Sequence, residues 1–174
     1  MDEGRDIVLR ALRRTRQVRR FIDEPVAEAD IQAILEVCRW TGSSTNTQPW
    51  HFIVIRDAEI RRRIAEVARY ARHVGGAPVA IAIEMPGDDP ETDAYDEGRV
   101  AERILIAAGA MDLGAGIGWA ETPEWAAIRE LLDVKAPGFV RTIVSIGHPT
   151  DEARRPRTGP GTGRRPLEGF VRER

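Results

Sequence analysis

The run Ser43-Ser44-Thr45-Asn46-Thr47-Gln48-Pro49-Trp50 is followed at once by His51-Phe52-Ile53-Val54-Ile55. The first part is rich in hydroxyl and amide side chains, which carry no charge and offer both donors and acceptors. The second part is β-branched and aromatic and lies between Pro49 and Asp57, so it predicts a buried strand. The polar part is either a turn that satisfies loose backbone groups or a contact for a polyol or a uracil-like edge, and both readings stay open on the residues alone.

Upstream of this run the sequence predicts two helices. Apolar residues at helical spacing give a short first helix that ends in a basic segment, residues 13–20. Pro25 then interrupts regular secondary structure. Residues 28–40 carry apolar side chains at i, i+3, i+4 and i+7, which predicts a second helix with one buried face that includes Cys38.

Downstream of this run, the predicted helices and strands do not alternate regularly. The expected elements are a helix at 60–71, a strand at 79–83, a solvent-facing acidic loop at 85–98, a helix at 100–113, a helix at 124–132 and a strand at 140–146. The helix at 100–113 is apolar on more than one face, so it must be covered on several sides. This order lacks the strict alternation of a doubly wound fold, and we expect an α+β domain.

The glycine-rich segment Gly114-Ala115-Gly116-Ile117-Gly118 comes after a helix, whereas a dinucleotide-binding fingerprint would follow a strand. A Rossmann domain is therefore rejected. The segment is either a helix stop followed by a turn or a place where backbone approaches a flat ligand, with Trp119 shaping the wall. Glu121 is either a general acid–base or an exposed turn carboxylate.

Composition limits the remaining classes. The 174 residues favour one domain, and 42% apolar residues are enough for a core. A net charge of -2 predicts no attraction to nucleic acid or anionic lipid, and no apolar run is long enough to span a membrane. The acidic start without a leader pattern predicts a cytoplasmic protein. With one cysteine and three histidines at no ligand spacing, we expect no metal site.

Two arginine-rich segments could bind phosphate, because guanidinium groups bind it bidentately. For residues 13–20 the alternatives are a solvated helix end and a nucleic-acid arm, although no aromatic residues are interleaved there. The second segment is Arg164-Arg165-Pro166-Leu167, within a Pro-, Gly- and Arg-rich arm that begins near Pro149. Its alternative is a disordered tail.

In this order, several motifs together resemble the nitroreductase family over residues 15–171. They are Val18-Arg19-Arg20-Phe21, Asp23-Glu24-Pro25-Val26, the run from Ser43 to Phe52, Leu113-Gly114-x-Gly116-x-x-Trp119 and Arg164-Arg165-Pro166-Leu167. The resemblance implies a three-layer αβα sandwich of α+β class with a central mixed sheet, in an intertwined homodimer. Residues 1–150 would form a single FMN-binding domain, and residues 151–174 an arm that packs on the partner subunit.

The resemblance also implies a set of flavin contacts. Those on the N-terminal segment are Arg16, Gln17 and Arg19, and those offered by the other subunit are Ser43, Ser44 and Asn46. Trp119, Ala120 and Glu121 would face the ring, with a backbone N–H directed at its hydride-accepting nitrogen, while Arg164 and Arg165 would close on the phosphate. Two departures stand out: Thr15 replaces a frequent arginine, and Gly42 replaces a frequent proline.

The function implied is hydride transfer from NAD(P)H through FMN to a small electrophilic acceptor of nitroaromatic, quinone or enone type. The flavin would carry the chemistry, so no catalytic side chain is expected. The chain is short for the family, which implies an open pocket. The alternatives are a flavin-dependent dehalogenase-like reductase, a flavin-binding redox sensor without rapid turnover, and an arginine-arm nucleic-acid binder.

Overall fold

The computed structural model describes residues 3–155 and 163–173. In chain order its elements are α1 (Glu3–Arg14), α2 (Glu28–Arg39), η1 (Ser44–Asn46), β1 (His51–Ile55), α3 (Ala58–Val67), η2 (Arg69–Gly76), β2 (Val79–Met85), α4 (Pro90–Ala110), β3 (Gly114–Trp119), η3 (Thr122–Glu124), α5 (Trp125–Leu132), β4 (Phe139–Gly147), α6 (Asp151–Arg154) and η4 (Leu167–Gly169). The expected helices and strands are present, although the helix expected at 60–71 divides into α3 and η2.

The four strands form one sheet in the order β1-β2-β4-β3, and each neighbouring pair is antiparallel. The α+β class is therefore confirmed. The expected mixed character is not found in this sheet. Within the described residues, the parallel pairing is an isolated bridge between Gln17 and Ala115, beside the outer edge of β3.

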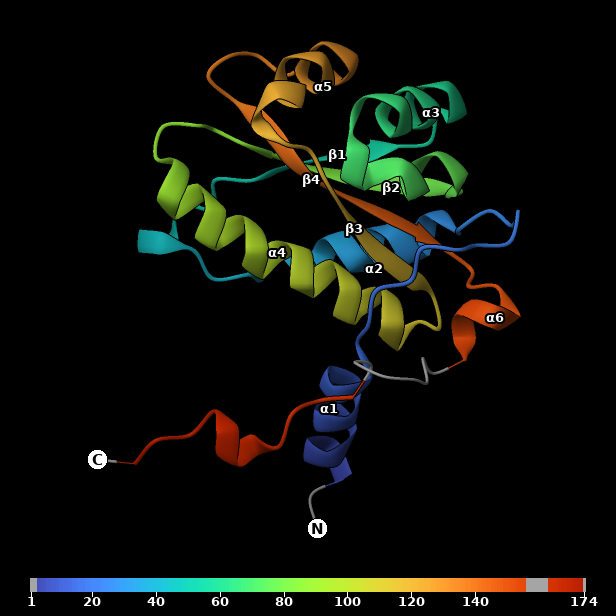
Figure 1. Cartoon of the computed structure of the whole chain (residues 1–174), viewed down its shortest axis with the longest axis vertical. Helices are drawn as coiled ribbons and strands as arrows, with labels where there is room; N and C mark the ends of the chain where they lie inside the picture. Colours follow the sequence, from blue (N-terminus) through green and yellow to red (C-terminus); the bar gives the residue numbers. More distant parts are fainter. Residues whose placement is uncertain (1–2, 156–162, 174) are drawn as a thin grey trace.

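Helices cover both faces of the sheet, which confirms the three layers (Figure 1). Side chains alternate along β2, because successive residues of a strand point to opposite faces. Ile81 and Ile83 pack into the cluster that α2 and α4 cover, whereas Ala80 and Ala82 pack into the cluster that α3, η2 and α5 cover. Cys38 lies fully buried in the first cluster, as expected, and this burial raises the pKa of its thiol to about 12.

The segment 85–98 is the largest correction to the sequence-based expectation. It is not a solvent-facing loop, because β2 continues through Met85 and α4 begins at Pro90. Asp89 caps the helix, its carboxylate accepting from the N–H groups of Glu91 and Thr92, and proline at the first helical position needs no donor. The acidic side chains that follow include three buried ones, Asp93, Asp96 and Glu97.

The glycine-rich segment is also corrected. It forms β3 rather than a turn, and its backbone is closely approached by protein rather than left open. A Cβ at Gly116 would stand 2.4 Å from the carbonyl oxygen of Val18, and one at Gly118 would stand 2.8 Å from Cβ of Ala71. Glycine is required here because two other segments pack directly on the strand.

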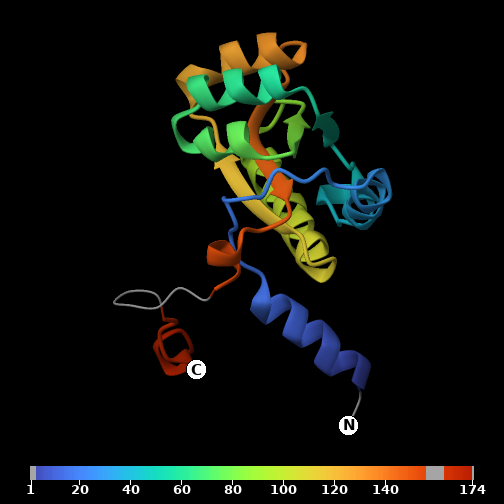
Figure 2. The same cartoon turned by 90° about the vertical axis from the view of Figure 1, so that its right-hand side faces the viewer.

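Helix α1 and residues 163–173 project from the sandwich on the same side (Figure 2). None of the residues of α1 is buried. Ile7 and Val8 are each 58% exposed, and Leu167 in the tail is 71% exposed. Both segments therefore carry apolar side chains that this single chain does not cover.

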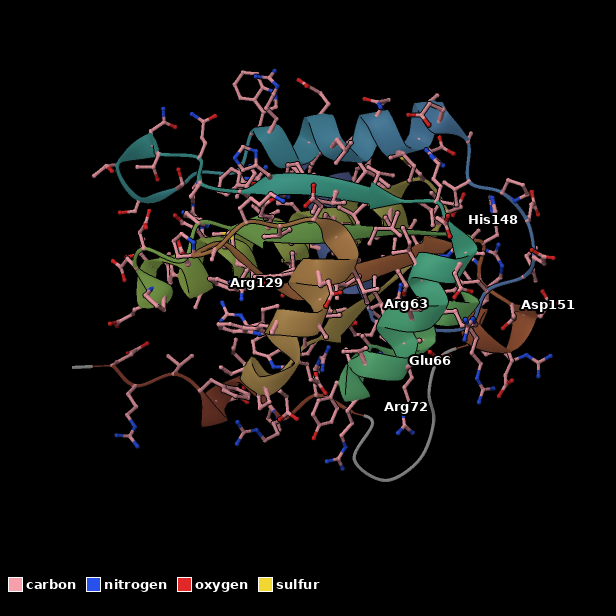
Figure 3. The ribbon with its side chains drawn as sticks, turned by 90° about the horizontal axis from the view of Figure 1, so that it is seen from above. Arg63, Glu66, Arg72, Arg129, His148 and Asp151 are labelled. Carbon is pink, nitrogen blue, oxygen red and sulfur yellow. The ribbon has the colours of Figure 1, made fainter. Side chains whose placement is uncertain are left out.

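The outer surface over α3 and η2 carries charges of both signs. Arg63, Glu66 and Arg72 lie at this surface (Figure 3), and Glu66 forms an ion pair with Arg62. Among the described residues, no helix is both long and apolar enough to cross a bilayer, and no three metal-ligating side chains gather around one point.

A buried ion pair joins α4 to β4. The register between β2 and β4 skips Arg141, and the Nε of this extra residue donates to the Glu97 carboxylate at 2.8 Å. The guanidinium also lies 5.0 Å from the ring of Trp119 and 5.4 Å from that of Phe139. A bulge of this kind re-aims a side chain, here from the sheet toward α4.

Replacing Glu97 by Ala should lower the free energy of unfolding by about 3–5 kcal/mol, because Arg141 would keep a buried charge without its carboxylate. Urea denaturation measures this change. The control is Glu28→Ala, which removes the exposed partner of Arg56 and should cost less than about 1 kcal/mol. Equal losses for the two variants would contradict a structural role for the buried pair.

Candidate functional site

The N-terminal segment that carries three of the expected flavin contacts runs along the outer edge of β3. The N–H of Val18 donates to the carbonyl of Ala115 at 2.7 Å, and the N–H of Ile117 donates to Oε1 of Gln17 at 2.6 Å. Farther on, Ile22 N–H donates to the carbonyl of His148 at 2.9 Å. These bonds fix the backbone on either side of Arg19.

The two arginines of this segment differ in how they are engaged. Arg16 donates from both terminal nitrogens to the carbonyls of Arg155 and Arg154, at 2.9 and 2.7 Å. Among the described residues, Arg19 makes one long bond, 3.4 Å, to the carbonyl of Ile117. Since a guanidinium has five N–H donors, Arg19 keeps most of its capacity for a ligand. Thr15 is occupied in ending α1, where its hydroxyl donates to the carbonyl of Ala11.

Ser43, Ser44 and Asn46 lie on a tight turn around η1. Asn46 N–H donates to the carbonyl of Ser43, and Gln48 N–H donates to the Ser43 hydroxyl at 2.8 Å. Thr45 and Asn46 adopt left-handed backbone angles, with φ of 47° and 59°. The turn thus exposes Ser44 and Asn46, while the Ser43 hydroxyl closes it.

The two groups of expected contacts do not meet within one chain. The turn attaches to α4 at Asp96, through the N–H of Ser44, whereas Val18 packs on Gly114 beyond the other end of α4. Residues 96–110 of a helix span roughly 20 Å at 1.5 Å per residue. Figure 1 shows the two segments at opposite ends of α4. One ligand could touch both groups only if a second copy brought its turn to this segment.

The end of β3 differs from the expectation in one respect. Trp119 is 43% exposed and lies against Arg141. The N–H of Ala120 donates to the carbonyl of Arg141, and that of Glu121 donates to the Glu124 carboxylate, each at 2.8 Å. The backbone N–H groups of the segment expected to face the flavin are thus bound by protein acceptors. A flavin contact through the Glu121 N–H would require its hydrogen bond to Glu124 to break.

Arg164 and Arg165 are exposed. The guanidinium of Arg165 lies 4.3 Å from the ring of Phe170. Within the described residues, neither arginine forms a hydrogen bond or ion pair with residues 15–22. The structure therefore does not bring the two basic segments together in a single chain.

Two residues near these groups were missed by the sequence-based reasoning. His73 lies 3.2 Å through Nε2 from the carbonyl of Gly116, which also accepts from the Ser145 hydroxyl. Because a carbonyl only accepts, Nε2 must carry the proton. Asp96 binds the turn. A lone histidine gave no sequence signal of a role near the site. Asp96, in contrast, lies at helical spacing on the buried stripe of α4, and this spacing could have identified it as a buried carboxylate.

Comparisons with known proteins point to one family. The sequence model of the Nitroreductase family matches residues 12–71. A protein of Archaeoglobus fulgidus whose assigned name is NADH dehydrogenase/NAD(P)H nitroreductase is 31% identical over 147 residues, which cover 79% of this chain and 82% of that protein. The FMN reductase [NAD(P)H] of Bacillus subtilis is 28% identical over 86% of this chain and 69% of its own length.

Solved structures agree as well. A structure from Desulfovibrio desulfuricans, assigned as a nitroreductase and determined in complex with FMN, is 30% identical and superimposes with a TM-score of 0.80 over 96% of each chain. The fold is thus that of a nitroreductase-like α+β sandwich. From its sequence relatives, the chain belongs to the nitroreductase family.

The pKa of His73 lies below its usual value of 6.5, chiefly because the ring is desolvated and secondarily because Arg19 is near. The folded protein then binds fewer protons than the unfolded chain below pH 6.5, so His73 lowers stability progressively as the pH falls from there through its lowered pKa. His73→Gln, which can still donate to Gly116, should lose less stability on acidification from pH 7 to about pH 5. Urea denaturation at a series of pH values tests this, and parallel curves for the two proteins would refute it.

Proposed function

We propose that the chain acts as a homodimer with two flavin sites, each assembled from the N-terminal segment of one subunit and the turn around η1 of the other. As a member of the nitroreductase family, it is an FMN-dependent NAD(P)H oxidoreductase. The observation that carries the proposal is the separation of the two donor groups by most of α4, together with the FMN-bound relative that covers nearly the whole chain.

The donor groups suit the chemistry of FMN. Guanidinium groups at Arg16, Arg164 and Arg165 match a phosphate, and Arg19 beside Gln17 matches the carbonyl and imide groups of a pyrimidine edge. The hydroxyl of Ser44 and the amide of Asn46 match ribityl hydroxyls or ring oxygens. The sheet edge between these groups offers Trp119 as a flat apolar wall.

FMN, when bound, supplies hydride transfer between NAD(P)H and an acceptor. The residues of this chain bind and orient it. Arg19 would hold a fixed positive charge at the edge where negative charge develops on reduction, and that charge lowers the barrier because the segment is already fixed on β3. Trp119, held over Arg141, would limit water at one side of the site.

The acceptor we propose is a small, flat electrophile of nitroaromatic, quinone or enone type. The Glu124 carboxylate accepts from the backbone N–H groups of Glu121 and Arg69, and Glu121 is exposed, so neither is presented as a positioned proton donor. Acceptors that need no such donor, because they are reduced by hydride alone and take protons from solvent, fit this site best. The partners are thus a second copy and small molecules.

The proposal is tested by releasing the flavin from purified protein, followed by anaerobic reduction with NADH or NADPH and a panel of oxidants. We expect FMN rather than FAD, since the two basic segments suit a terminal phosphate. Rapid reoxidation by quinones or nitroaromatics supports the reductase, whereas slow turnover with bound flavin would favour a redox sensor. A protein that binds no FMN would refute the proposal.

Arg19→Ala should weaken FMN binding and slow the reduction of retained flavin, together by about 2–4 kcal/mol, because a charge-assisted bond near the developing charge is lost. Fluorescence titration with FMN and stopped-flow reduction measure the two effects. The control is Arg20→Ala, whose side chain pairs with Glu152 at an exposed surface and should leave both nearly unchanged. If the two variants behave identically, Arg19 is a solvent-exposed side chain without a role in flavin binding.

The shared site predicts complementation between two inactive variants. Arg19→Ala and Asn46→Ala should each impair both sites of a homodimer. A mixed dimer holds one doubly altered site and one intact site, so co-expression should restore about half of the wild-type flavin per mixed dimer. Flavin content after tandem-tag purification measures this, and no recovery in a verified mixed dimer would contradict a site shared between subunits.

A chain ending at Pro156 tests the arm. This truncation keeps the carbonyls that Arg16 binds but removes Arg164 and Arg165. We expect lower FMN affinity and a weaker dimer by light scattering, since ligand and partner both stabilise the native state. A truncated dimer with full flavin occupancy would show that the arm does not build the site.

A further inference from the structure

Asp96 is a fully buried carboxylate whose two oxygens are both engaged. Oδ2 accepts from the N–H of Ser44 at 3.0 Å, and Oδ1 accepts from Arg99 at 3.3 Å. Ser44 is 52 residues away in sequence and lies on the turn around η1. A buried charge is costly unless it is paired, so this position needs a specific reason to be acidic.

The turn is conformationally demanding. Thr45, Asn46 and Gln48 all have φ between 47° and 59°, a region that non-glycine residues seldom adopt. The turn closes on itself through Ser43, but within the described residues the bond from Ser44 to Asp96 is the one side-chain hydrogen bond that ties residues 43–48 to another element. Without it, little would hold this backbone in place.

Gly42 and Arg99 extend the same arrangement. A Cβ at Gly42 would stand 2.7 Å from Nη2 of Arg99, so the glycine leaves room for the guanidinium that Asp96 binds. The ring of Tyr95 lies 5.8 Å from the same guanidinium. A larger residue at position 42 would have to displace the end of the Arg99 side chain from this place.

We propose that Asp96 is a positioning residue for the cofactor: by holding Ser44, it fixes the turn in the geometry that offers Ser44 and Asn46 to the flavin of the other subunit. This inference rests on the proposed function, because the turn matters only if it contacts FMN. A preorganised turn binds more tightly, since less conformational entropy is lost on binding.

The test compares three variants of α4 by titrating flavin-free protein with FMN and by measuring thermal stability without FMN. Asp96→Ala should weaken FMN binding about tenfold or more, because the bond to a charged acceptor is lost. Asp96→Asn should recover most of the affinity, since its amide oxygen can still accept from Ser44.

The matched control is Asp93→Ala, one turn earlier on the same helix. Asp93 is also buried, and its carboxylate accepts from the backbone N–H of Gly87 at 2.9 Å instead of from a residue of the turn. The Asp93→Ala variant should lose stability as Asp96→Ala does, but its FMN affinity should stay within about twofold of the wild-type value. If Asp96→Ala does not fold, Asp96→Ser replaces it, because its hydroxyl is too short to reach Ser44.

The outcomes separate this inference from the proposed function. If the wild-type protein does not bind FMN, the proposed function fails. If the wild type binds FMN and Asp96→Ala binds it equally well, the positioning role is refuted. Equal weakening by Asp96→Ala and Asp93→Ala also refutes it, because the effect would then follow from stability alone.

Discussion

Helix α4 must bury one continuous stripe along the face of the sheet, and the first turns of that stripe are acidic. The buried positions begin with Asp93, Asp96 and Glu97 and continue through Val100, Ala101, Ile104, Leu105, Ala107 and Ala108, largely at i+3 and i+4 spacing. Each acidic side chain finds a partner on a different segment: the Gly87 loop, the turn at Ser44 and β4 at Arg141. The polar start of the helix therefore fixes loops, while its apolar end fills the core.

The division of the candidate site follows from this helix. Its start holds the turn that offers hydroxyl and amide groups, and its end leads into β3, where the N-terminal segment offers guanidinium groups. A rigid helix cannot bring its own two ends together, so the same element that orders both groups keeps them apart in one chain. The exposed apolar side chains of α1 and of the tail are what a second copy would need in order to close that gap.

The sequence predicted the parts of the fold whose signal is local. The periodicity of residues 28–40 and the β-branched run at 51–55 gave correct elements, because one buried face dictates each pattern. It failed where tertiary contacts override composition. The acidic residues Asp93, Asp96 and Glu97 indicated a solvated loop, because their partners lie at distant positions in the chain. The glycines of β3 indicated a turn, because the close packing of Val18 and Ala71 on them cannot be seen in the sequence. The site residues stay predictions, and the hydrogen bonds of Arg16 and of the N–H groups after β3 could not be foreseen because they depend on the folded backbone.

Arg16, a proposed phosphate ligand, is already bound to the arm. Its guanidinium binds the carbonyls of Arg154 and Arg155 in the first part of the arm, and Thr150 N–H in turn donates to the carbonyl of Arg20. The same segment that presents Arg19 beside β3 therefore sets where the arm begins. A phosphate that attracts Arg16 would compete with those carbonyls, whereas Arg164 and Arg165 would add to its binding from the arm itself. If Arg16 binds FMN as proposed, flavin occupancy and arm placement are coupled through this one side chain, because each changes the bonds available to the other.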